Sequence, residues 1–277
     1  LPGGVVSAED ERIRSGEVSR YNQTDATRGH FLSADFSWAA KALGGNTSFM
    51  RFLSTYRTYY KIGGPTRGTV LAGNLTVGLA QLFDVRDKNG NGRIDDFDGL
   101  LPISERFFSG GSTTLRGFPF EEAGPRQVIV PQGQFRDRQG NLIGINPFTV
   151  PIGGNAEVVL NLEARVPLTR DVQIVPFYDG GNVFRSIGDI FSRKPITPSG
   201  NFVEDVNAPN LRVRWGHTVG LGFRSKTPLG GALAVDYGFL LNPSRFLIPQ
   251  NLNTLNPTTT VFQIQKGQFQ FRFSQTF

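Results

Sequence analysis

The side chains of this chain alternate between apolar and polar over many long segments, with a period of two residues. Segment 156–166 is the clearest case, because all of its even positions are apolar and most of its odd positions, such as Glu157, Asn161 and Glu163, are polar. Successive side chains of a β-strand point to opposite faces, so this pattern predicts a strand with one apolar and one polar face.

Eight segments are predicted as strands on this basis. They cover residues 28–41, 48–62, 69–83, 156–166, 172–184, 211–224, 233–241 and 268–274. Turns rich in glycine separate most of them, for example Gly44-Gly45-Asn46. Most run for about 10 to 15 residues, beyond the usual length of strands in soluble sheets and long enough for a tilted strand to cross a bilayer.

The polar faces of these strands indicate what surrounds the sheet. They carry mainly Gly, Ser, Thr and Asn with few Lys or Glu, whereas the exposed faces of soluble sheets are usually charged. We therefore predict an all-β fold, a transmembrane antiparallel β-barrel with apolar faces toward lipid and small polar residues toward the lumen. A soluble β-sandwich is the alternative. Aromatic residues near strand ends would form interfacial girdles: Trp38, Tyr59, Tyr60, Trp215 and Phe277.

Composition excludes several classes of protein. The 277 residues include no Cys, which rules out disulfide frameworks and cysteine-ligated metal sites, and no apolar run is long enough for a membrane helix. The net charge of +6 comes from basic residues spread singly along the chain, so we expect no nucleic-acid partner. His30 and His217 are the only histidines, and no Gly-x-Ser-x-Gly, P-loop or metalloprotease motif occurs. We therefore expect no enzyme activity.

A long insertion, residues 84–155, separates the third and fourth predicted strands, and loops of this length tend to be functional. Its first motif spaces oxygen-bearing side chains as an EF-hand calcium loop does, although its last position holds Asp in place of Glu, as in the dockerin-like loops that it resembles. The candidate calcium ligands are Asp87, Asn89, Asn91, Asp95, Asp98 and the backbone carbonyl of Arg93. Because no flanking helices are evident, we expect calcium to act as a structural staple, with a solvated turn as the alternative.

A second motif in the insertion covers residues 105–118 and ends in Arg116-Gly117-Phe118. It resembles the signature of the sixth surface loop in the BamA/TamA family of outer-membrane assembly factors, the bacterial surface antigens, whose core is Arg-Gly-Phe or Arg-Gly-Tyr. Further motifs follow in the family's order, namely Gly154-Asn155, Leu162-Glu163, the Phe-Tyr-Asp-Gly-Gly-Asn-Val stretch at 177–183 and the Thr-Pro-Leu-Gly stretch at 227–230. The resemblance covers about residues 24–277 and rests on several motifs in register.

The resemblance implies a place for this loop inside a barrel. In that family the loop folds into the lumen, and its arginine pairs with acidic residues on the lumen wall. Carried onto this sequence, Arg116, Gly117 and Phe118 would form the loop tip, and Arg116 would meet Glu163 and Asp179. Such a pairing is chemically reasonable, because one guanidinium can bridge carboxylates that are shielded from water. A solvated Arg116 is the alternative.

The last predicted strand resembles the family's sorting signal, which is recognised by strand pairing. Its alternating aromatic residues are Phe269, Phe271 and Phe273, and Phe277 supplies the terminal ring. Contact of these rings with lipid alone is the alternative, and the two interpretations are compatible.

The family's function is implied in turn: insertion of proteins into the bacterial outer membrane, or translocation, through a laterally opening barrel. The alternatives are a two-partner-secretion-type pore and a passive, calcium-stabilised porin or structural surface barrel. Implied partners are outer-membrane lipids, unfolded outer-membrane proteins, periplasmic POTRA domains and accessory lipoproteins. Family barrels have sixteen strands, and an eight-stranded barrel could not also house the 84–155 loop. We therefore expect residues 1–277 to be the C-terminal half of a larger barrel. Closure by pairing with another chain, and a loop that stays outside the barrel, are the alternatives.

Overall fold

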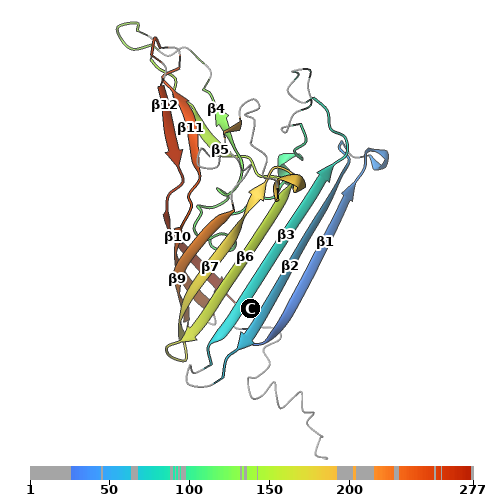
Figure 1. The fold of residues 1–277 in the computed structure, drawn as a ribbon, viewed down its shortest axis with the longest axis vertical. Helices are drawn as coiled ribbons and strands as arrows, with labels where there is room; N and C mark the ends of the chain where they lie inside the picture. The colour runs from blue at the N-terminus through green and yellow to red at the C-terminus, as the bar shows by residue number, and fades with distance from the viewer. Residues whose placement is uncertain are drawn as a thin grey trace, which may run out of the picture.

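Eight long strands form one antiparallel sheet in the computed structural model of the chain (Figure 1). The structure describes residues 26–275 except 45, 64–67, 88–89, 91, 93, 95–97, 132, 134–135, 142, 192–201, 204–214, 228–230, 253 and 257. The sheet has the order β1-β2-β3-β6-β7-β9-β10-β13. Its strands are β1 (Gly29–Ala39), β2 (Phe49–Lys61), β3 (Val70–Leu82), β6 (Ala156–Pro167), β7 (Val172–Phe184), β9 (Gly216–Lys226), β10 (Gly231–Leu240) and β13 (Gly267–Gln275).

Each of these strands corresponds to one of the eight predicted from sequence, and most boundaries agree within a few residues. The largest difference is at β9, which begins at Gly216, whereas the alternation predicted a start at residue 211. Residues 211–214 lie outside the described part of the chain, and Trp215 precedes the strand. The agreement confirms the antiparallel all-β fold.

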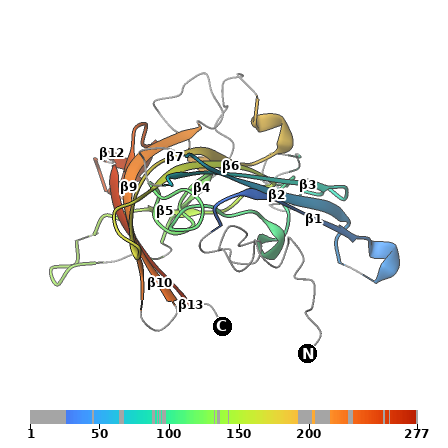
Figure 2. The ribbon, with the colours of Figure 1, turned by 90° about the horizontal axis from the view of Figure 1, so that it is seen from below.

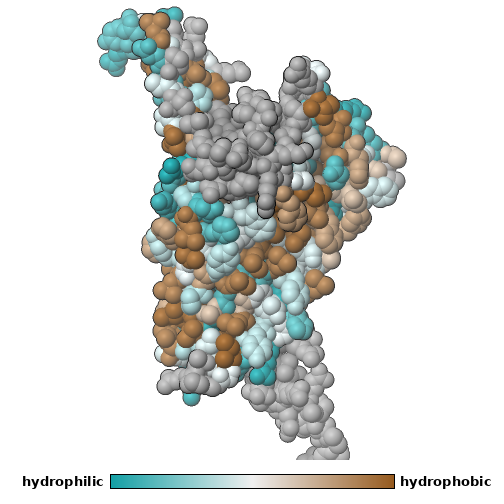
Figure 3. All heavy atoms as spheres, viewed as in Figure 1, coloured by the Kyte–Doolittle hydropathy of each residue, from teal (hydrophilic) through white to brown (hydrophobic). Residues whose placement is uncertain are grey.

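The exposure of the side chains follows the predicted two faces. On β13, Phe269, Phe271 and Phe273 are each more than half exposed, while Gln270 and Arg272 between them are partly buried on the other face. The outward face is the convex one, and Figure 3 shows apolar residues spread across it. Alternation along each strand thus separates an apolar outer surface from a polar inner one.

The sheet curves strongly, and the insertion between β3 and β6 lies in its concave side (Figure 2). Among the described strands β1 and β13 stand at the two ends of the sheet order and do not pair with each other. These eight strands therefore form an open, curved wall around part of the insertion.

The connections differ in length at the two ends of the sheet (Figure 1). At one end they are short, covering residues 62–69, 168–171 and 227–230. At the other they are longer, covering residues 40–48, 83–155, 185–215 and 241–266. Short turns on one side and long loops on the other are typical of outer-membrane barrels.

Five short strands lie in the long connections and were not predicted. They are β4 (Arg126–Ile129), β5 (Phe148–Pro151) and β8 (Phe202–Val203) in one sheet, and β11 (Arg245–Gln250) and β12 (Thr258–Gln263) in another. Strands this short give little periodicity to detect. They form the part of the molecule above the long-loop end in Figure 1.

Helical structure in the described part of the chain consists of one-turn 3-10 helices. They are η1 (Lys41–Leu43), η2 (Ile103–Glu105) and η3 (Ile187–Asp189). In the part of the chain that the structure describes, no helix is long and apolar enough to span a membrane.

Candidate functional site: a loop tip held on the concave face

The segment 107–123 of the insertion forms a compact excursion with its own hydrogen bonds. Phe107 exchanges two backbone hydrogen bonds with Gly154, of 2.8 and 3.0 Å, which fixes the base of the excursion beside the start of β6. The Ala123 amide donates to the Ser109 carbonyl at 3.0 Å. At the tip, the Phe118 amide donates to the Leu115 carbonyl at 3.0 Å. The turn this makes directs Arg116 toward the inner wall of the sheet.

Arg116 is bound by carboxylates from two neighbouring strands. Its Nε and Nη2 donate to the two oxygens of Asp179 on β7 at 2.8 and 2.6 Å, and its backbone amide donates to Asp179 Oδ2 at 3.1 Å. Its Nη1 donates to Glu163 Oε1 on β6 at 2.6 Å. The structure thus brings together the three charged residues that the family resemblance pairs.

The Arg116 pairs are shielded from water. The side chains of Arg116 and Asp179 are 3% and 0% exposed, and that of Glu163 is 13% exposed. The guanidinium also lies 3.5 Å from the centre of the Phe177 ring, in cation–π contact. Burial alone would lower the pKa of Arg116, but the hydrogen bond and charge of Asp179 and the charges of Glu163 and Asp236 raise it, so the guanidinium stays protonated.

Residues outside the sequence prediction complete this cluster. Asp236 on β10 is 1% exposed, and its Oδ2 lies 3.8 Å from Nη1 of Arg116. Arg224 on β9 forms an ion pair with Asp236. Arg165 donates from Nε to Glu163 Oε2 at 3.1 Å. Asn161 donates from Nδ2 to Asp179 Oδ1 at 2.8 Å and to the Thr114 carbonyl at 2.6 Å. The cluster therefore spans four strands, β6, β7, β9 and β10.

A sequence signal for these additional residues existed. Asn161, Arg165, Arg224 and Asp236 all occupy the polar alternation positions of their strands, which the sequence had assigned to the inner face. Alternation predicts which face of the sheet a side chain lies on. It does not predict which inward side chains of neighbouring strands lie side by side, so the cluster itself was not predicted.

The two residues after Arg116 fit closely against the wall. A Cβ on Gly117 would collide with the Thr218 side chain, so this position accepts only glycine without rearrangement. Phe118 is 1% exposed and belongs to a buried cluster with Leu115, Val159 and Leu240. The tip is thus held by apolar packing as well as by charge.

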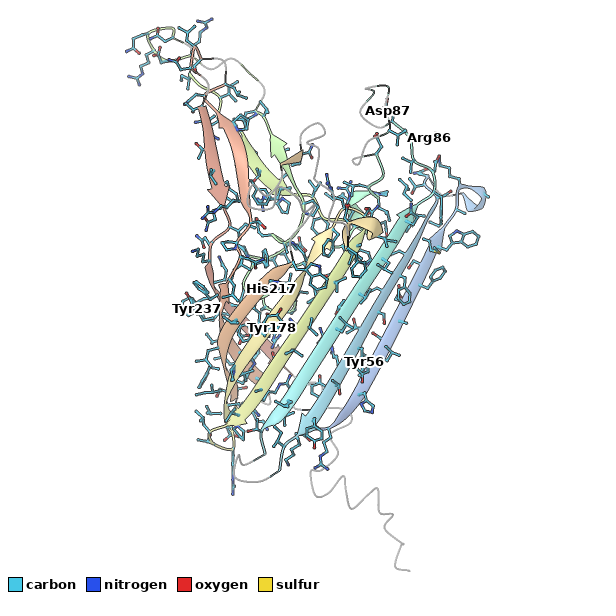
Figure 4. All side chains as sticks on the ribbon, viewed as in Figure 1. Tyr56, Arg86, Asp87, Tyr178, His217 and Tyr237 are labelled. Atoms are coloured by element: carbon cyan, nitrogen blue, oxygen red, sulfur yellow. The ribbon has the colours of Figure 1, made fainter. Side chains whose placement is uncertain are left out.

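The calcium-type motif lies at the beginning of the same insertion, and Figure 4 shows Asp87 at the long-loop end of the sheet. The Asp87 carboxylate accepts hydrogen bonds from the amides of Gly90 and Gly92 at 2.6 and 2.7 Å. Both glycines have positive φ, of 70° and 76°. Asn89, Asn91, Arg93 and Asp95 lie outside the described residues; Asp98, the last predicted ligand, is described and fully buried.

The geometry around Asp87 fits the turn that the calcium motif requires. In an EF-hand-type loop a glycine at position 6 makes the sharp bend, and Gly92, with φ of 76°, holds that position here. Among the residues that the structure describes, no three His, Asp or Glu side chains gather as a metal site. Because four of the six predicted ligands lie outside that part of the chain, calcium binding stays a prediction.

The predicted sorting strand is β13, which pairs with β10 and stands at one end of the sheet. Phe269, Phe271 and Phe273 point outward, and Phe277 lies outside the described residues. Their use as a recognition signal is a prediction that this geometry permits.

The histidines do not form a site with each other. His30 lies on β1 and His217 on β9, with β2, β3, β6 and β7 between them in the sheet. His217 Nδ1 is 2.7 Å from the Tyr178 hydroxyl on the outer face, and the two labelled residues lie side by side in Figure 4. A hydrogen-bonded pair of this kind gives a polar side chain a partner on an apolar surface.

Comparison with known proteins agrees with this arrangement. The Omp85 superfamily domain matches residues 18–277 of the chain. The fold is similar to that of BamA from Haemophilus ducreyi lacking POTRA domains 1–3, with a TM-score of 0.56 and 16% sequence identity over 92% of this chain and 40% of that chain. The chain therefore spans less than half the length of that structure. It belongs to the Omp85 superfamily and is a β-barrel protein of the bacterial outer membrane.

Proposed function

We propose that this chain forms the C-terminal part of a laterally opening barrel that inserts proteins into the outer membrane. The observation that carries the proposal is the buried Arg116 cluster, which holds the insertion against the inner wall in a member of the Omp85 superfamily. The mechanism requires no catalytic residue, because strand pairing at a sheet edge supplies the template for an incoming strand.

The loop tip packed on the concave face argues against a passive porin. A porin needs an aqueous lumen, whereas here the tip segment packs buried Leu115 and Phe118 against the wall and pairs Arg116 with Glu163 and Asp179. Burying the charges of Arg116 and Asp179 costs desolvation free energy, which a barrel serving only for diffusion has no need to offset. We propose that the insertion acts as a latch that holds the barrel in one state between substrates.

The partners in this proposal follow from the family. We propose unfolded outer-membrane proteins as substrates, with periplasmic POTRA domains and accessory lipoproteins delivering them to the barrel. The BamA structure similar to this chain is described as lacking POTRA domains 1–3. Secretion of a partner protein is the second candidate function.

Insertion can be measured directly. The complete protein would be reconstituted in liposomes, and a urea-unfolded outer-membrane barrel protein would be added. We expect the substrate to fold into the bilayer faster than in liposomes holding a passive porin. Arg116→Ala should slow this by about tenfold, the effect of about 1.4 kcal/mol added to the activation barrier when the loop tip is no longer seated.

Arg136→Ala is the matched control, because Arg136 is an exposed arginine of the same insertion whose Nη1 donates locally, to the Gly140 carbonyl at 2.7 Å. It should insert substrate at the unmutated rate. Folding no faster than with the porin would contradict the insertase function. If an unfolded protein passes into the liposome lumen and does not insert into the bilayer, the result would favour the secretion pore.

We also propose that calcium binds the motif between Asp87 and Asp98 and stiffens the beginning of the insertion. The first support is the turn at Asp87, whose carboxylate accepts two backbone amides. The second is that the residues following the motif are held in place: the Asn155 side chain donates to the Gly99 carbonyl at 2.8 Å and accepts from the Leu101 amide at 3.0 Å. These two bonds fix residues 99–101 beside the start of β6, so the motif has one anchored end.

Calorimetric titration with calcium tests this proposal. The unmutated protein should bind one calcium ion per chain, and Asp87→Ala should abolish the heat. Asp84→Ala is the control, because Asp84 precedes the motif and pairs with Lys41 and Arg86. Absence of heat in the unmutated protein, or equal heat in the Asp87 variant, would refute the site.

A further inference from the structure

Two side chains of the last strand hold the backbone of the loop tip. Gln270 Nε2 donates to the Phe118 carbonyl at 3.1 Å, and Arg272 Nη1 donates to the Ser112 carbonyl at 3.1 Å. Ser112 and Phe118 lie on either side of Arg116 in the sequence. β13 therefore grips the tip on both sides of the arginine that β6 and β7 bind.

The strand pairing extends the buried cluster to these two residues. Gln270 lies opposite Asp236 in the β10–β13 register, and Arg272 lies opposite Ala234. Asp236 is bound to Arg224 and lies near Arg116, so Gln270 adjoins the charged cluster. A Cβ on Gly238 of β10 would come within 2.7 Å of the Arg116 carbonyl oxygen, which shows how closely the tip approaches this end of the sheet.

Of the five strands that contact the loop tip, β13 has the fewest strand neighbours. Among the described strands it has one neighbour, β10, whereas β6, β7, β9 and β10 each have two. A strand at the end of a sheet has half of its backbone groups available to another strand and gains less from pairing than an inner strand does. Side-chain hydrogen bonds to the loop tip therefore contribute a larger share of the free energy that keeps β13 in place than they do for an inner strand.

We propose that Gln270 and Arg272 are positioning residues that couple the seated loop tip to β13. Release of the tip loosens β13, and displacement of β13 loosens the tip, because a coupling free energy between two elements acts equally in both directions. If the barrel inserts or translocates proteins, as proposed above, a strand that binds the β13 edge opposite β10 and the Arg116 latch would each sense the other's state.

Hydrogen–deuterium exchange of the complete protein, folded in detergent, tests the coupling without any substrate. Gln270→Ala combined with Arg272→Ala should speed amide exchange in residues 110–120 by about tenfold, the effect expected from the loss of two hydrogen bonds. In the reciprocal experiment, Arg116→Ala should speed exchange in residues 267–275. Exchange in β1, which stands at the end of the sheet opposite β13, provides the internal reference.

Gln268→Ala is the matched control. Gln268 has the same residue type, strand and inward face as Gln270, but its Nε2 donates to Gln265 Oε1 at 2.9 Å and not to the loop. It should leave exchange at the tip unchanged. Should the double variant fail to fold, Arg272→Lys and Gln270→Ala are measured singly. The lysine variant should show the smaller effect, because its ammonium can still donate to the Ser112 carbonyl.

A change of less than about threefold in either direction, or an equal change in the Gln268 variant, would overturn the proposal. The result is separable from the insertion assay. Reciprocal coupling without insertion would refute the proposed function and leave the coupling proposal intact. Insertion without reciprocal coupling would refute the coupling proposal and leave the proposed function intact.

Discussion

At the scale of single residues, Arg116 shows why this position requires arginine. A buried charge is costly unless every polar direction is satisfied, and the guanidinium presents its donors in a plane that fits the two oxygens of Asp179 while still reaching Glu163. A lysine ammonium could approach one carboxylate but could not make this bidentate contact. The Phe177 ring beside the guanidinium further favours a flat cation.

Exchange of charges between Arg116 and Asp179 tests the pairing. Arg116→Asp and Asp179→Arg should each destabilise the folded protein by about 3 kcal/mol or more, because each leaves like charges buried together. The double variant restores opposite charges and should recover part of the loss. Recovery should be incomplete, since an acidic group at position 116 would lie near Glu163 and Asp236.

The measurement is the temperature at which the folded band disappears in semi-native electrophoresis. A matched swap outside the cluster is available in Arg185 and Asp189, a buried pair beyond β7 whose exchange should not interact with Arg116. A double variant no more stable than either single variant would show that the Arg116–Asp179 contact does not hold the tip.

At the scale of elements, a second buried arginine joins the short strands outside the main sheet. Arg126 at the start of β4 is 3% exposed, forms an ion pair with Glu122 and donates to the Thr149 hydroxyl and carbonyl, both at 3.0 Å. Its guanidinium lies 5.2 Å from the centre of the Phe262 ring and 5.8 Å from that of Phe246. One residue thus links β4 and β5 to the β11–β12 hairpin.

Arg126→Ala should loosen this outer region without releasing the Arg116 tip. The loss of an ion pair, two hydrogen bonds and ring contacts should cost about 2 kcal/mol, because Glu122 stays partly exposed and can be solvated. We expect faster proteolysis within residues 126–151 and 245–263.

Arg245→Ala is the control, because Arg245 is an exposed arginine of the same hairpin and donates to Gln263 Oε1 at 2.9 Å. Its proteolysis should match that of the unmutated protein. If the Arg126 variant is proteolysed at the same rate as the unmutated protein, strand pairing alone holds these elements together.

At the scale of the whole molecule, residues 112–118 at the tip of the excursion contact the curved sheet from β6 through β13. An eight-stranded barrel closed on itself has an interior just filled by side chains of its own strands. These eight strands carry the tip segment on their concave face in addition, so we propose that they belong to a wider barrel. The short connections at one end and the long ones at the other agree with a membrane orientation in which the insertion begins on the outer side.

The local pattern of the sequence was sufficient for the strands and their faces. Alternation along 156–166 and 268–274 is a property of adjacent residues, and the pleat of a strand converts it directly into an inner and an outer face. Local alternation could not predict where β9 begins or that the short strands β4, β5 and β8 form. The extent of these elements depends on partner strands that are distant in the chain.

Alternation and the family motif were thus enough to predict the fold class, the two faces and the pairing of Arg116 with Glu163 and Asp179. That Asp236 and Arg224 join the same cluster, and that Gln270 and Arg272 hold the tip, emerged from the folded arrangement alone. The cause is strand register. Which inward residues meet depends on how strands far apart in sequence are aligned, and on where a long loop comes to rest against them.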